Sequence, residues 1–456
     1  MSTPPSTRAP TLGLPDDLHA IAVTPGDRSY RDYSATFFRG GAPAVVFRAR
    51  HTDHVRSVVR FAAAYPDLPF SIRSGGHGIS GRSTNRGGIV LDLAEMNDIT
   101  LEDPATGIVR VQPGAKWIDV AHTLQPHGLG ISSGDYGGVG VGGLATAGGA
   151  GWLVREHGLT IDHVRAVEMV LADGSLVRAD ADTRPDLFWA ARGAGANFGV
   201  ATAFEIAASP VSLVGWAQFA LQTDDAARLL LDWGSALESA PRQVTSSVIL
   251  GPADPGRPVV ARVNTVVHSE DPEAIRELLA PFASLGRLVQ QSAQLVPYPY
   301  VIDNVYPGPH QGVGEPHSRS AAVRHISADL ARGFADLMTT GEAGWFQIRA
   351  LGGAVADVPP DATAFAHRDA NFLPGALGRS KDGMNRAWDR LREHFDGLYL
   401  SFESDDRPGR LTEAFPPPTL TRLRNLKRVY DPGNLFRDNF NIDPAESGTR
   451  ESEHRQ

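Results

Sequence analysis

The sequence predicts a two-domain α+β protein, and three observations lead to this fold class. The chain has 456 residues, which is more than a single hydrophobic core usually serves. Between about 40 and 208, short β-rich runs alternate with glycine turns and form no regular βαβ repeat. From about 209 the glycine density falls, and longer helical patterns alternate with clear strands. We therefore expect lead-in residues over 1–34, a first domain over 35–208 and a second over 209–409.

The first domain is predicted to contain short strands and three helices. Four early apolar runs with β-rich composition are expected to be strands: Ala44–Arg48, Pro69–Arg73, Gly88–Leu93 and Gly107–Val111. A helix capped by Thr52 would place apolar residues 55, 58, 59 and 62 on one face, and a second helix is expected over Trp117–Leu124. Later come a hairpin with an Ala-Asp-Gly turn over His163–Arg178, a helix over Arg184–Ala191 and a strand over Gly199–Ile206.

The second domain is predicted to pair longer helices with a sheet. The expected helices are Asp224–Leu237 and Pro272–Ser284, and the expected strands are Thr245–Leu250, Val259–Val267, Trp345–Leu351 and Leu398–Ser404. A basic amphipathic helix over Leu420–Tyr430 and an Asp-Pro-Gly turn follow, within a separate C-terminal segment over 410–445. The polar residues 446–456 are expected to be disordered.

Composition limits the class of function. Forty-three basic and fifty-two acidic residues give a net charge of −9 without long runs of one sign, which disfavours nucleic-acid binding and favours a small-molecule substrate. No stretch approaches the roughly 20 apolar residues of a membrane span, and the first ten residues lack the apolar segment of a secretory signal, so we expect a cytoplasmic protein. The chain has no cysteine, which excludes disulfides, thiolate metal sites and cysteine nucleophiles. We predict no metal site.

The first unusual motif is Ser71-Ile-Arg-Ser-Gly-Gly-His77-Gly, in which a probable strand runs into a glycine turn that presents an imidazole. Without side chains at positions 75, 76 and 78, the main chain can approach an anion closely. A hairpin turn with a surface histidine explains this segment equally well.

The second motif is a glycine-rich segment over 134–151, where nine of eighteen residues are glycine. We expect neither helix nor strand within it. Leu144, Trp152 and Leu153 favour a packed loop over a flexible linker. Gly138, Gly140 and Gly143 have GxGxxG spacing, but the sequence Ile131-Ser-Ser-Gly-Asp-Tyr precedes them and more glycine follows, so we reject a Rossmann dinucleotide site.

Together with Arg192-Gly-Ala-Gly-Ala-Asn-Phe-Gly199 and Tyr430-Asp-Pro-Gly-Asn-Leu-Phe-Arg-Asp-Asn-Phe-Asn-Ile442, these motifs resemble the FAD domain of the vanillyl-alcohol oxidase superfamily. The berberine-bridge-like branch is the most similar. The resemblance implies a PCMH-type FAD-binding fold, with residues 35–208 and 410–445 around the cofactor and a mixed-sheet substrate domain facing its ring system.

The resemblance also implies that His77 is bonded to the 8α-methyl carbon of FAD. The absence of cysteine excludes a second link, so the chain resembles the singly attached branch that includes 6-hydroxynicotine oxidase; Tyr136 takes the place of the second-link cysteine. The expected cofactor-binding residues are Ile72, Arg73, Ser74, Gly75, Gly76, His77, Gly78, Ser133, Gly134, Gly138, Gly140, Gly142, Gly143, Gly148, Gly149, Trp152, Asp162, Asn197, Gly199, Val200, Asn439 and Asn441.

The catalytic residues are less defined. Val139 resembles the small gate residue that admits oxygen to reduced flavin, although a packing role is the alternative. Several relatives use a tyrosine where this chain has Phe415 or Pro416, so another base or an amine substrate is expected. The candidates are Tyr136, Tyr306, His310 and His325; His367 and Arg368 are expected to be structural.

We expect an oxidase that transfers hydride from a small organic substrate, at C–OH or C–NH, to FAD and then to oxygen, plausibly in secondary metabolism, as a monomer or homodimer. A dehydrogenase with another electron acceptor and a catalytically silent flavin-binding protein are the alternatives.

Overall fold

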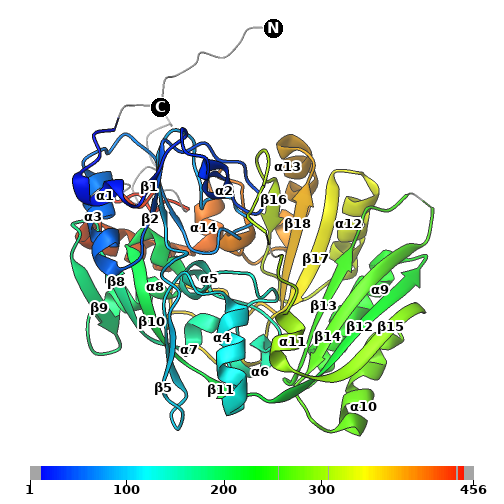
Figure 1. The fold of residues 1–456 in the computed structure, drawn as a ribbon. Coiled ribbons are helices and arrows are strands. Elements are labelled where there is room, and N and C mark those ends of the chain that lie inside the picture. Colours follow the sequence, from blue (N-terminus) through cyan, green and yellow to red (C-terminus); the bar gives the residue numbers. More distant parts are fainter. Residues whose placement is uncertain (1–11, 255, 307, 438–439, 446–456) are drawn as a thin grey trace.

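The computed structural model describes residues 12–254, 256–306, 308–437 and 440–445. Its main sheets have four strands in the order β1-β2-β4-β3, five in the order β5-β6-β10-β8-β9, and seven in the order β15-β12-β14-β13-β17-β18-β16. The first two sheets use residues 22–207 and the third uses 213–378. Figure 1 shows the first two on one side of the molecule and the seven-stranded sheet on the other. The α+β class is confirmed, and the predicted domain boundaries stay predictions.

The four-stranded sheet positions the first glycine turn. Its strands β2 (Val45–Arg48), β4 (Ile89–Asp92) and β3 (Phe70–Arg73) are parallel, and β1 (Ala22–Val23) is antiparallel at the edge. Helix α3 (Thr52–Ala63) packs its predicted apolar face into this core. The prediction of Thr52 as its cap is wrong by one residue, because the N-cap is His51, whose side chain makes no capping hydrogen bond. The five-stranded sheet consists of β5 (Ile99–Asp103), β6 (Ile108–Val111), β8 (Val164–Val170), β9 (Leu176–Asp180) and β10 (Val200–Ala207).

The seven-stranded sheet is antiparallel in every recorded pairing, so the prediction of a mixed sheet is wrong in strand direction. Short hairpin connections such as the one between β13 and β14 force neighbouring strands to run in opposite directions. Its strands are β12 (Leu213–Thr223), β13 (Val244–Leu250), β14 (Val259–Val267), β15 (Arg287–Pro297), β16 (Ser318–Ser320), β17 (Ala343–Ala350) and β18 (Phe372–Gly378).

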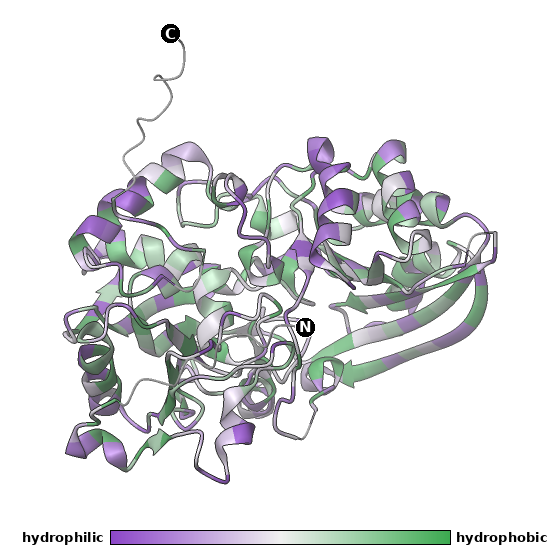
Figure 2. Cartoon of the chain, turned by 90° about the horizontal axis from the view of Figure 1, so that it is seen from above, coloured by the Kyte–Doolittle hydropathy of each residue, from purple (hydrophilic) through white to green (hydrophobic). Residues whose placement is uncertain are grey.

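One face of this sheet is covered by helices α9 (Ala226–Ser239), α10 (Pro272–Ala283) and α12 (Ala328–Thr339). In β12, Ala217, Phe219 and Leu221 lie in the core that includes these helices, whereas Trp216 and Gln218 alternate with them on the opposite face. Figure 2 shows the alternating hydrophobic and hydrophilic residues along the long strands. The sheet therefore keeps one face free to line a site.

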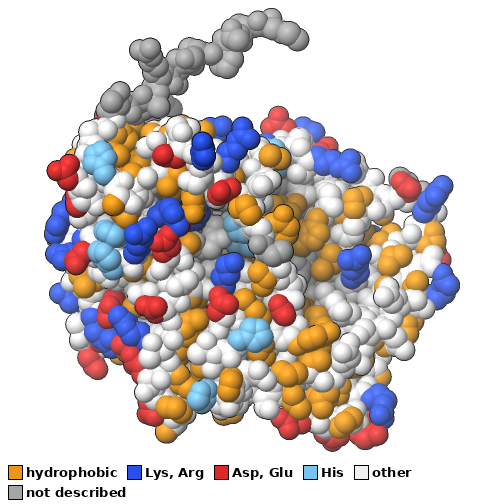
Figure 3. Space-filling model, in the orientation of Figure 1, with side chains coloured by type: hydrophobic (Ala, Val, Ile, Leu, Met, Phe, Trp, Pro, Cys, Tyr) orange, Lys and Arg blue, Asp and Glu red, His pale blue; other side chains and the backbone are white. Residues whose placement is uncertain are grey.

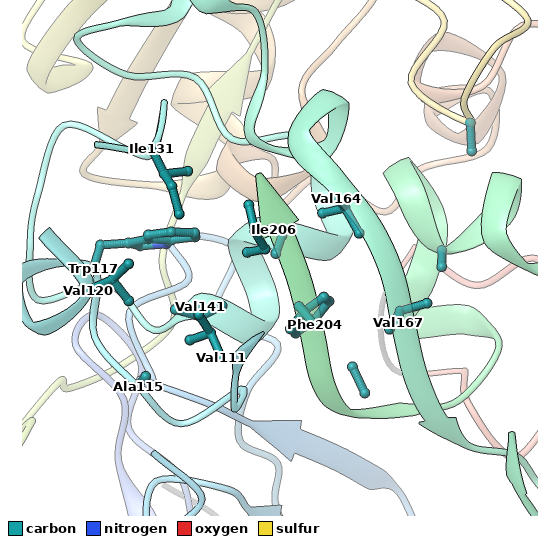
Figure 4. Close-up of a cluster of buried hydrophobic side chains, with 14 of the residues drawn as sticks. Val111, Ala115, Trp117, Val120, Ile131, Val141, Val164, Val167, Phe204 and Ile206 are labelled. Carbon is teal, nitrogen blue, oxygen red and sulfur yellow. The ribbon is translucent and has the colours of Figure 1, made fainter. Parts of the chain in front are cut away.

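The glycine-rich segment contains a helix, α5 (Val141–Ala147), which corrects the prediction that this segment holds neither helix nor strand. Val141 lies in the large buried cluster with Val111, Trp117 and Phe204 (Figure 4). The apolar anchor and the alanine-rich sequence after Gly143 compensate for the low helix propensity of glycine. The segment is packed, as predicted. The strand that precedes it, β7 (Leu129–Gly130), has only two residues and does not run directly into the segment.

The C-terminal segment returns to the first half of the molecule. Helix α15 (Pro417–Tyr430) packs against α8 (Pro185–Ala194), and the buried ammonium of Lys427 donates to the carbonyls of Asn197 and Phe436 at 2.7 and 2.8 Å and to Asp431. The strand predicted over Leu398–Ser404 is wrong: a 3-10 turn, η5 (Leu400–Phe402), lies there beside the site.

The remaining short elements complete the chain: α1 Asp16–His19, α2 Tyr30–Ser34, α4 Trp117–Leu124, η1 Gln125–His127, α6 Val154–His157, α7 Thr160–His163, η2 Gly195–Asn197, β11 Ser209–Pro210, α11 Tyr298–Ile302, η3 Gly353–Val355, α13 Lys381–Asp389, η4 Arg392–His394 and α14 Arg410–Ala414. No helix of the described residues is both long and apolar enough to span a membrane.

Candidate active site

A cavity of about 660 Å³ lies between the glycine loops and the free face of the seven-stranded sheet. In Figure 3 the surface is hollowed between the two halves of the molecule. The volume is within the range of cofactor and ligand sites. The cavity has two walls: the loop wall, formed by residues 72–78 and 134–143, and the sheet wall, formed by side chains of β12, β13, β14 and β17.

The loop wall depends on direct contact between its two glycine loops. A Cβ atom on Gly140 would lie 2.2 Å from Ser74 Oγ and 2.3 Å from the nitrogen of Gly75. A Cβ atom on Gly75 would in turn lie 2.5 Å from the nitrogen of Gly140. These distances are shorter than van der Waals contact, so only glycine lets the loops meet and expose their backbone to the cavity.

His77 lies on the cavity wall with an unusual environment. Its ring stacks on Phe37, with centroids 4.2 Å apart, and lies 4.6 Å from the ring of Tyr136. Burial, with a smaller contribution from His310, lowers the pKa of His77 to about 4. Its Nε2 atom is buried and has no hydrogen-bond partner among the described residues. The ring is therefore neutral at physiological pH and has a free nitrogen.

The sheet wall is a row of polar side chains in cross-strand register. Gln218 of β12 pairs with Asn264 of β14, Asn264 also pairs with Ser247 of β13, and Ser247 pairs with Arg349 of β17. Residues opposite each other on adjacent strands point to the same face of a sheet. Gln218, Asn264 and Arg349 line the cavity, so the row places two amides and a guanidinium along it, with the buried Ser247 between them.

One ion pair joins the two walls. Arg349 Nε donates to Asp135 Oδ2 at 2.7 Å, and Gln347 Nε2 donates to the same oxygen at 3.4 Å. Asp135 precedes Tyr136 in the glycine-rich segment. Arg349 also lies 4.3 Å from the ring of Phe402. Among the described residues that line the cavity, Asp135 is the only acidic residue and Arg349 is the only basic one apart from the neutral His77. The charges of the cavity therefore balance.

Comparison with known proteins places this geometry in a family. Residues 43–180 match the family model described as FAD binding domain. The chain is 30% identical over 463 residues to (R)-6-hydroxynicotine oxidase of Paenarthrobacter nicotinovorans, covering 96% of this chain and 99% of that protein. It is also 30% identical over 447 residues to xylooligosaccharide oxidase of Thermothelomyces thermophilus, covering 89% and 88%. The chain belongs to the berberine-bridge-like FAD-linked oxidases of the vanillyl-alcohol oxidase superfamily.

Solved structures agree with this assignment. The crystal structure of 6-hydroxy-D-nicotine oxidase from Arthrobacter nicotinovorans matches with a TM-score of 0.78 and 27% identity over 93% of this chain and 97% of that one. This member of the family is therefore an FAD-linked oxidoreductase, as the resemblance implied. The rejection of a Rossmann site also agrees with the family, although a helix does follow the GxGxxG glycines.

The walls of the cavity have two features that fit a bound FAD, namely unpaired buried polar atoms and exposed backbone. His77 and Trp152 line the cavity, and the buried Nε2 of His77 and Nε1 of Trp152 lack hydrogen-bond partners among the described residues. Buried polar atoms normally have partners, so unpaired ones at a cavity indicate a polar ligand. The glycine contact exposes the backbone of the loop wall beside them.

Most of the predicted cofactor-binding residues meet at this cavity. Those that line it are Ile72, Ser74, Gly75, Gly76, His77, Gly78, Gly134, Gly140, Gly142, Gly143, Trp152, Asn197, Gly199 and Val200. Of the catalytic candidates, Tyr136 and Val139 line it too.

Several other predicted residues support the walls from behind. Arg73 forms a buried ion pair with Asp92, with Nε 3.1 Å from Oδ2, and this pair fixes the start of the first glycine turn. His310 donates from Nε2 to the carbonyl of Gly75 at 2.9 Å, which holds the back of that turn. Gly148 contacts Tyr399, and Gly149 contacts Thr160. Ser133 contacts Tyr298, and Gly138 packs on Tyr136.

Three further predicted residues do not bring their side chains to the cavity. Asp162 instead forms two hydrogen bonds of 2.8 Å with Arg368, which agrees with the predicted structural role of Arg368. His325 is 74% exposed and pairs with Glu238 at 3.0 Å. The side chain of Tyr306 is exposed, and only its backbone N–H reaches the hydroxyl of Tyr136, at 2.7 Å.

The two asparagines of the C-terminal motif have different outcomes. Asn439 lies outside the described residues. Asn441 does not line the cavity, but its Oδ1 is buried without a partner among the described residues. Phe415, one of the two residues expected at the position of the tyrosine of several relatives, is 1% exposed and packs in the main core, so it offers no group to a substrate.

Sequence reasoning missed the sheet wall. No recognisable motif contains its polar residues, which are Gln218, Asn264, Gln347 and Arg349. Strands β14 and β17 were predicted without their register, and β12 was not predicted at all. Asp135, beside Tyr136, was not among the predicted site residues either. The period-two alternation of Trp345, Gln347 and Arg349 with apolar residues was the available signal for a polar sheet face.

Proposed function

We propose that this enzyme is an oxidase that binds FAD covalently through His77 and oxidises a neutral, hydrogen-bonding substrate at a C–OH or C–NH bond. The observation that carries the proposal is the buried, partner-free Nε2 of a neutral His77 facing the cavity. A covalent bond to a methylene carbon requires a nitrogen lone pair, which a neutral imidazole supplies and a protonated one does not.

When bound, FAD would accept hydride from the substrate and pass the electrons to oxygen, giving hydrogen peroxide. Val139 lines the cavity between Tyr136 and the contact of the two glycine loops, and its small side chain supports a path for oxygen. The alternative of a dehydrogenase would need an obstruction on that path.

The sheet wall supports the substrate class. Gln218, Asn264 and Gln347 can donate and accept hydrogen bonds, and Asp135 is neutralised by Arg349. A charged substrate would have to break the Asp135–Arg349 pair, whereas a neutral one can bond to the amides and leave it intact. The proton that leaves the substrate O–H or N–H has two possible acceptors on these walls, the hydroxyl of Tyr136 and the carboxylate of Asp135.

The covalent link is tested by mass and colour. Denatured wild-type protein should remain yellow and weigh one FAD more than the chain, whereas His77→Ala should release all its flavin on denaturation. A covalent adduct that persists in His77→Ala would contradict the assignment. Oxygen consumption and peroxide release, screened with neutral alcohols and amines, test the oxidase reaction; substrate-dependent flavin bleaching without peroxide would indicate a dehydrogenase.

A further inference from the structure

A second cluster of chemically active side chains lies away from the cavity, where the two halves of the molecule meet. Helix α6 (Val154–His157) packs against β13 and carries Glu156 and His157, and His268 follows the last residue of β14. His268 Nδ1 lies 2.6 Å from Glu156 Oε2, and His157 Nε2 lies 3.8 Å from the same oxygen. None of the three lines the cavity.

This cluster contains an unexplained polar atom. The Nε2 of His157 is buried and has no hydrogen-bond partner among the described residues. The backbone carbonyl of His157 is occupied by Nε2 of His163, at 2.8 Å, so the neighbouring histidine does not satisfy the ring. A buried nitrogen that faces a carboxylate and a second imidazole without a bond of its own calls for a ligand.

The ionisation of the cluster suits a cation. Burial is the main cause that lowers the pKa of His157, so its ring is neutral and its lone pair is available. Burial alone would raise the pKa of Glu156, but the hydrogen bond from His268 is the main cause that holds that pKa below its usual value. The cluster thus offers one carboxylate and two imidazoles.

We propose that Glu156, His157 and His268 bind a divalent transition-metal ion, with zinc as the best fit, that joins α6 to the seven-stranded sheet. The potential ligand atoms lie within 4.8 Å of one another. Zinc holds nitrogen and oxygen ligands at about 2.0–2.2 Å, so its ligand atoms lie roughly 3.3 Å apart in a tetrahedron. Glu156 Oε2 lies 2.6 Å from His268 Nδ1 and 3.8 Å from His157 Nε2, so these two distances would each change by about 1 Å or less.

The ligand types select this class of ion. Imidazole is a good ligand for zinc, copper and nickel, whereas magnesium and calcium prefer oxygen. Coordination through Nδ1 of His268 requires the hydrogen of this imidazole to lie on Nε2. Two histidines, one carboxylate and a water molecule would complete four-coordination.

The position gives the ion a structural role. Arg155, also on α6, donates to the carbonyls of Ala240, Pro241 and Val244 at 3.0, 3.1 and 2.6 Å on the sheet side of the same junction. A metal ion bound by Glu156, His157 and His268 would connect the same two parts of the molecule a second time. These parts are the segment of α6, which follows Trp152, and the seven-stranded sheet that forms the opposite wall of the cavity. The sequence predicted no metal site because Glu156 and His268 are 112 residues apart.

The test uses the flavin-loaded enzyme after dialysis against a chelator, titrated with zinc chloride in an isothermal calorimeter and by thermal unfolding. We expect one zinc per chain at micromolar concentration or below, and a rise in Tm of several degrees on saturation. His157→Gln and His268→Asn should each weaken binding by at least about tenfold and abolish the rise in Tm. Using two variants from different halves keeps the test usable if one folds poorly.

The matched control is the double variant His51→Gln and His54→Gln, which removes a stacked surface pair whose rings lie 3.7 Å apart. It should bind zinc like wild type. If zinc binding persists in both cluster variants, disappears in the surface control, or is absent at micromolar zinc in wild type, the proposed site is wrong.

Discussion

The two walls of the cavity are built by different physical means. The loop wall is made of backbone from two glycine segments, it carries a neutral imidazole, and its shape depends on the absence of side chains at Gly75 and Gly140. The sheet wall is made of side chains from four strands, held in one row by cross-strand register. The first wall is suited to a cofactor that is the same throughout a family, and the second can vary without disturbing the first.

The largest expected effect follows from closing the loop wall. Gly140→Ala would place a methyl group 2.2 Å from Ser74 Oγ and 2.3 Å from the Gly75 nitrogen, so the two loops must separate. We expect less than about a tenth of wild-type flavin content and a fall in Tm of several degrees, because backbone rather than a flexible side chain must move. Absorbance of the purified protein and thermal unfolding measure both effects.

Gly143→Ala, in the helix α5 that Gly140 caps, is the matched control. A Cβ atom at Gly143 meets nothing within 4 Å, and alanine is the better helix former by about 1 kcal/mol. Because Gly143 lines the cavity, the comparison uses flavin-free protein, whose Tm should equal or exceed that of flavin-free wild type. Equal losses of Tm in the two variants would show that contact between the loops does not hold the wall together.

The same difference explains what the sequence could and could not predict. Gly75, His77 and Gly140 belong to local motifs, so their place at the site follows from a few neighbouring residues. Gln218 and Arg349 reach the site only because β12, β14, β13 and β17 pair in one register, which no single segment encodes. Asp162 and Arg73 were assigned from their motifs, but the structure uses both in ion pairs that shape loops.

The sequence predicted most of the secondary structure where hydrophobic periodicity was strong. Helix α4 and strand β14 have the predicted limits, and α3 buries the predicted face. Helix α5 was missed because its glycine content outweighs its short apolar pattern, and packing of Val141 in the core decides the outcome. The turn over Leu400–Phe402 was mistaken for a strand because an apolar run of that length fits either structure.

A change in the sheet wall should separate catalysis from cofactor binding. Arg349→Ala would leave the partly buried carboxylate of Asp135 with only the 3.4 Å contact from Gln347. We expect kcat/KM to fall on the order of a hundredfold, because an uncompensated charge then faces the substrate. Steady-state kinetics measure the loss, and bound flavin should remain at the wild-type level.

Arg349→Lys serves as the conservative variant for this pair. It keeps the positive charge but not the planar guanidinium, so its kcat/KM should lie between those of wild type and Arg349→Ala. A parallel loss of flavin in both variants would assign Arg349 to the cofactor wall and remove the distinction between the walls.

Oxygen access is expected to depend on the loop wall alone. Val139→Leu adds a methylene group to a side chain that lines the cavity, which should slow reoxidation of the reduced enzyme by roughly tenfold while leaving its reduction unchanged. Stopped-flow mixing with oxygen after anaerobic reduction measures this step. If reduced wild-type enzyme does not react with oxygen within minutes, the oxidase proposal is wrong.

Tyr136 stands where the walls meet, beside His77 on one side and Asp135 on the other. Its hydroxyl already accepts a hydrogen bond from the backbone of Tyr306, which suits a positioning role. Tyr136→Phe should therefore slow flavin reduction by about tenfold or less, whereas loss of a general base would cost on the order of a hundredfold or more. A large loss that also removes the basic limb of the pH profile would make Tyr136 the base.

The smallest expected effect concerns the pH dependence of flavin attachment. Burial lowers the pKa of His77 from 6.5 to about 4, so the folded apoprotein keeps this imidazole neutral at pH values where an ordinary histidine is protonated. Between pH 7.5 and 5.5 the neutral fraction of an ordinary histidine falls about tenfold, but that of His77 falls by only a few per cent. The initial rate of covalent incorporation, followed by intact mass after mixing apoprotein with FAD, should accordingly change less than about twofold over this interval. A tenfold fall with a midpoint near pH 6.5 would show that the loop wall leaves His77 hydrated and does not hold it neutral.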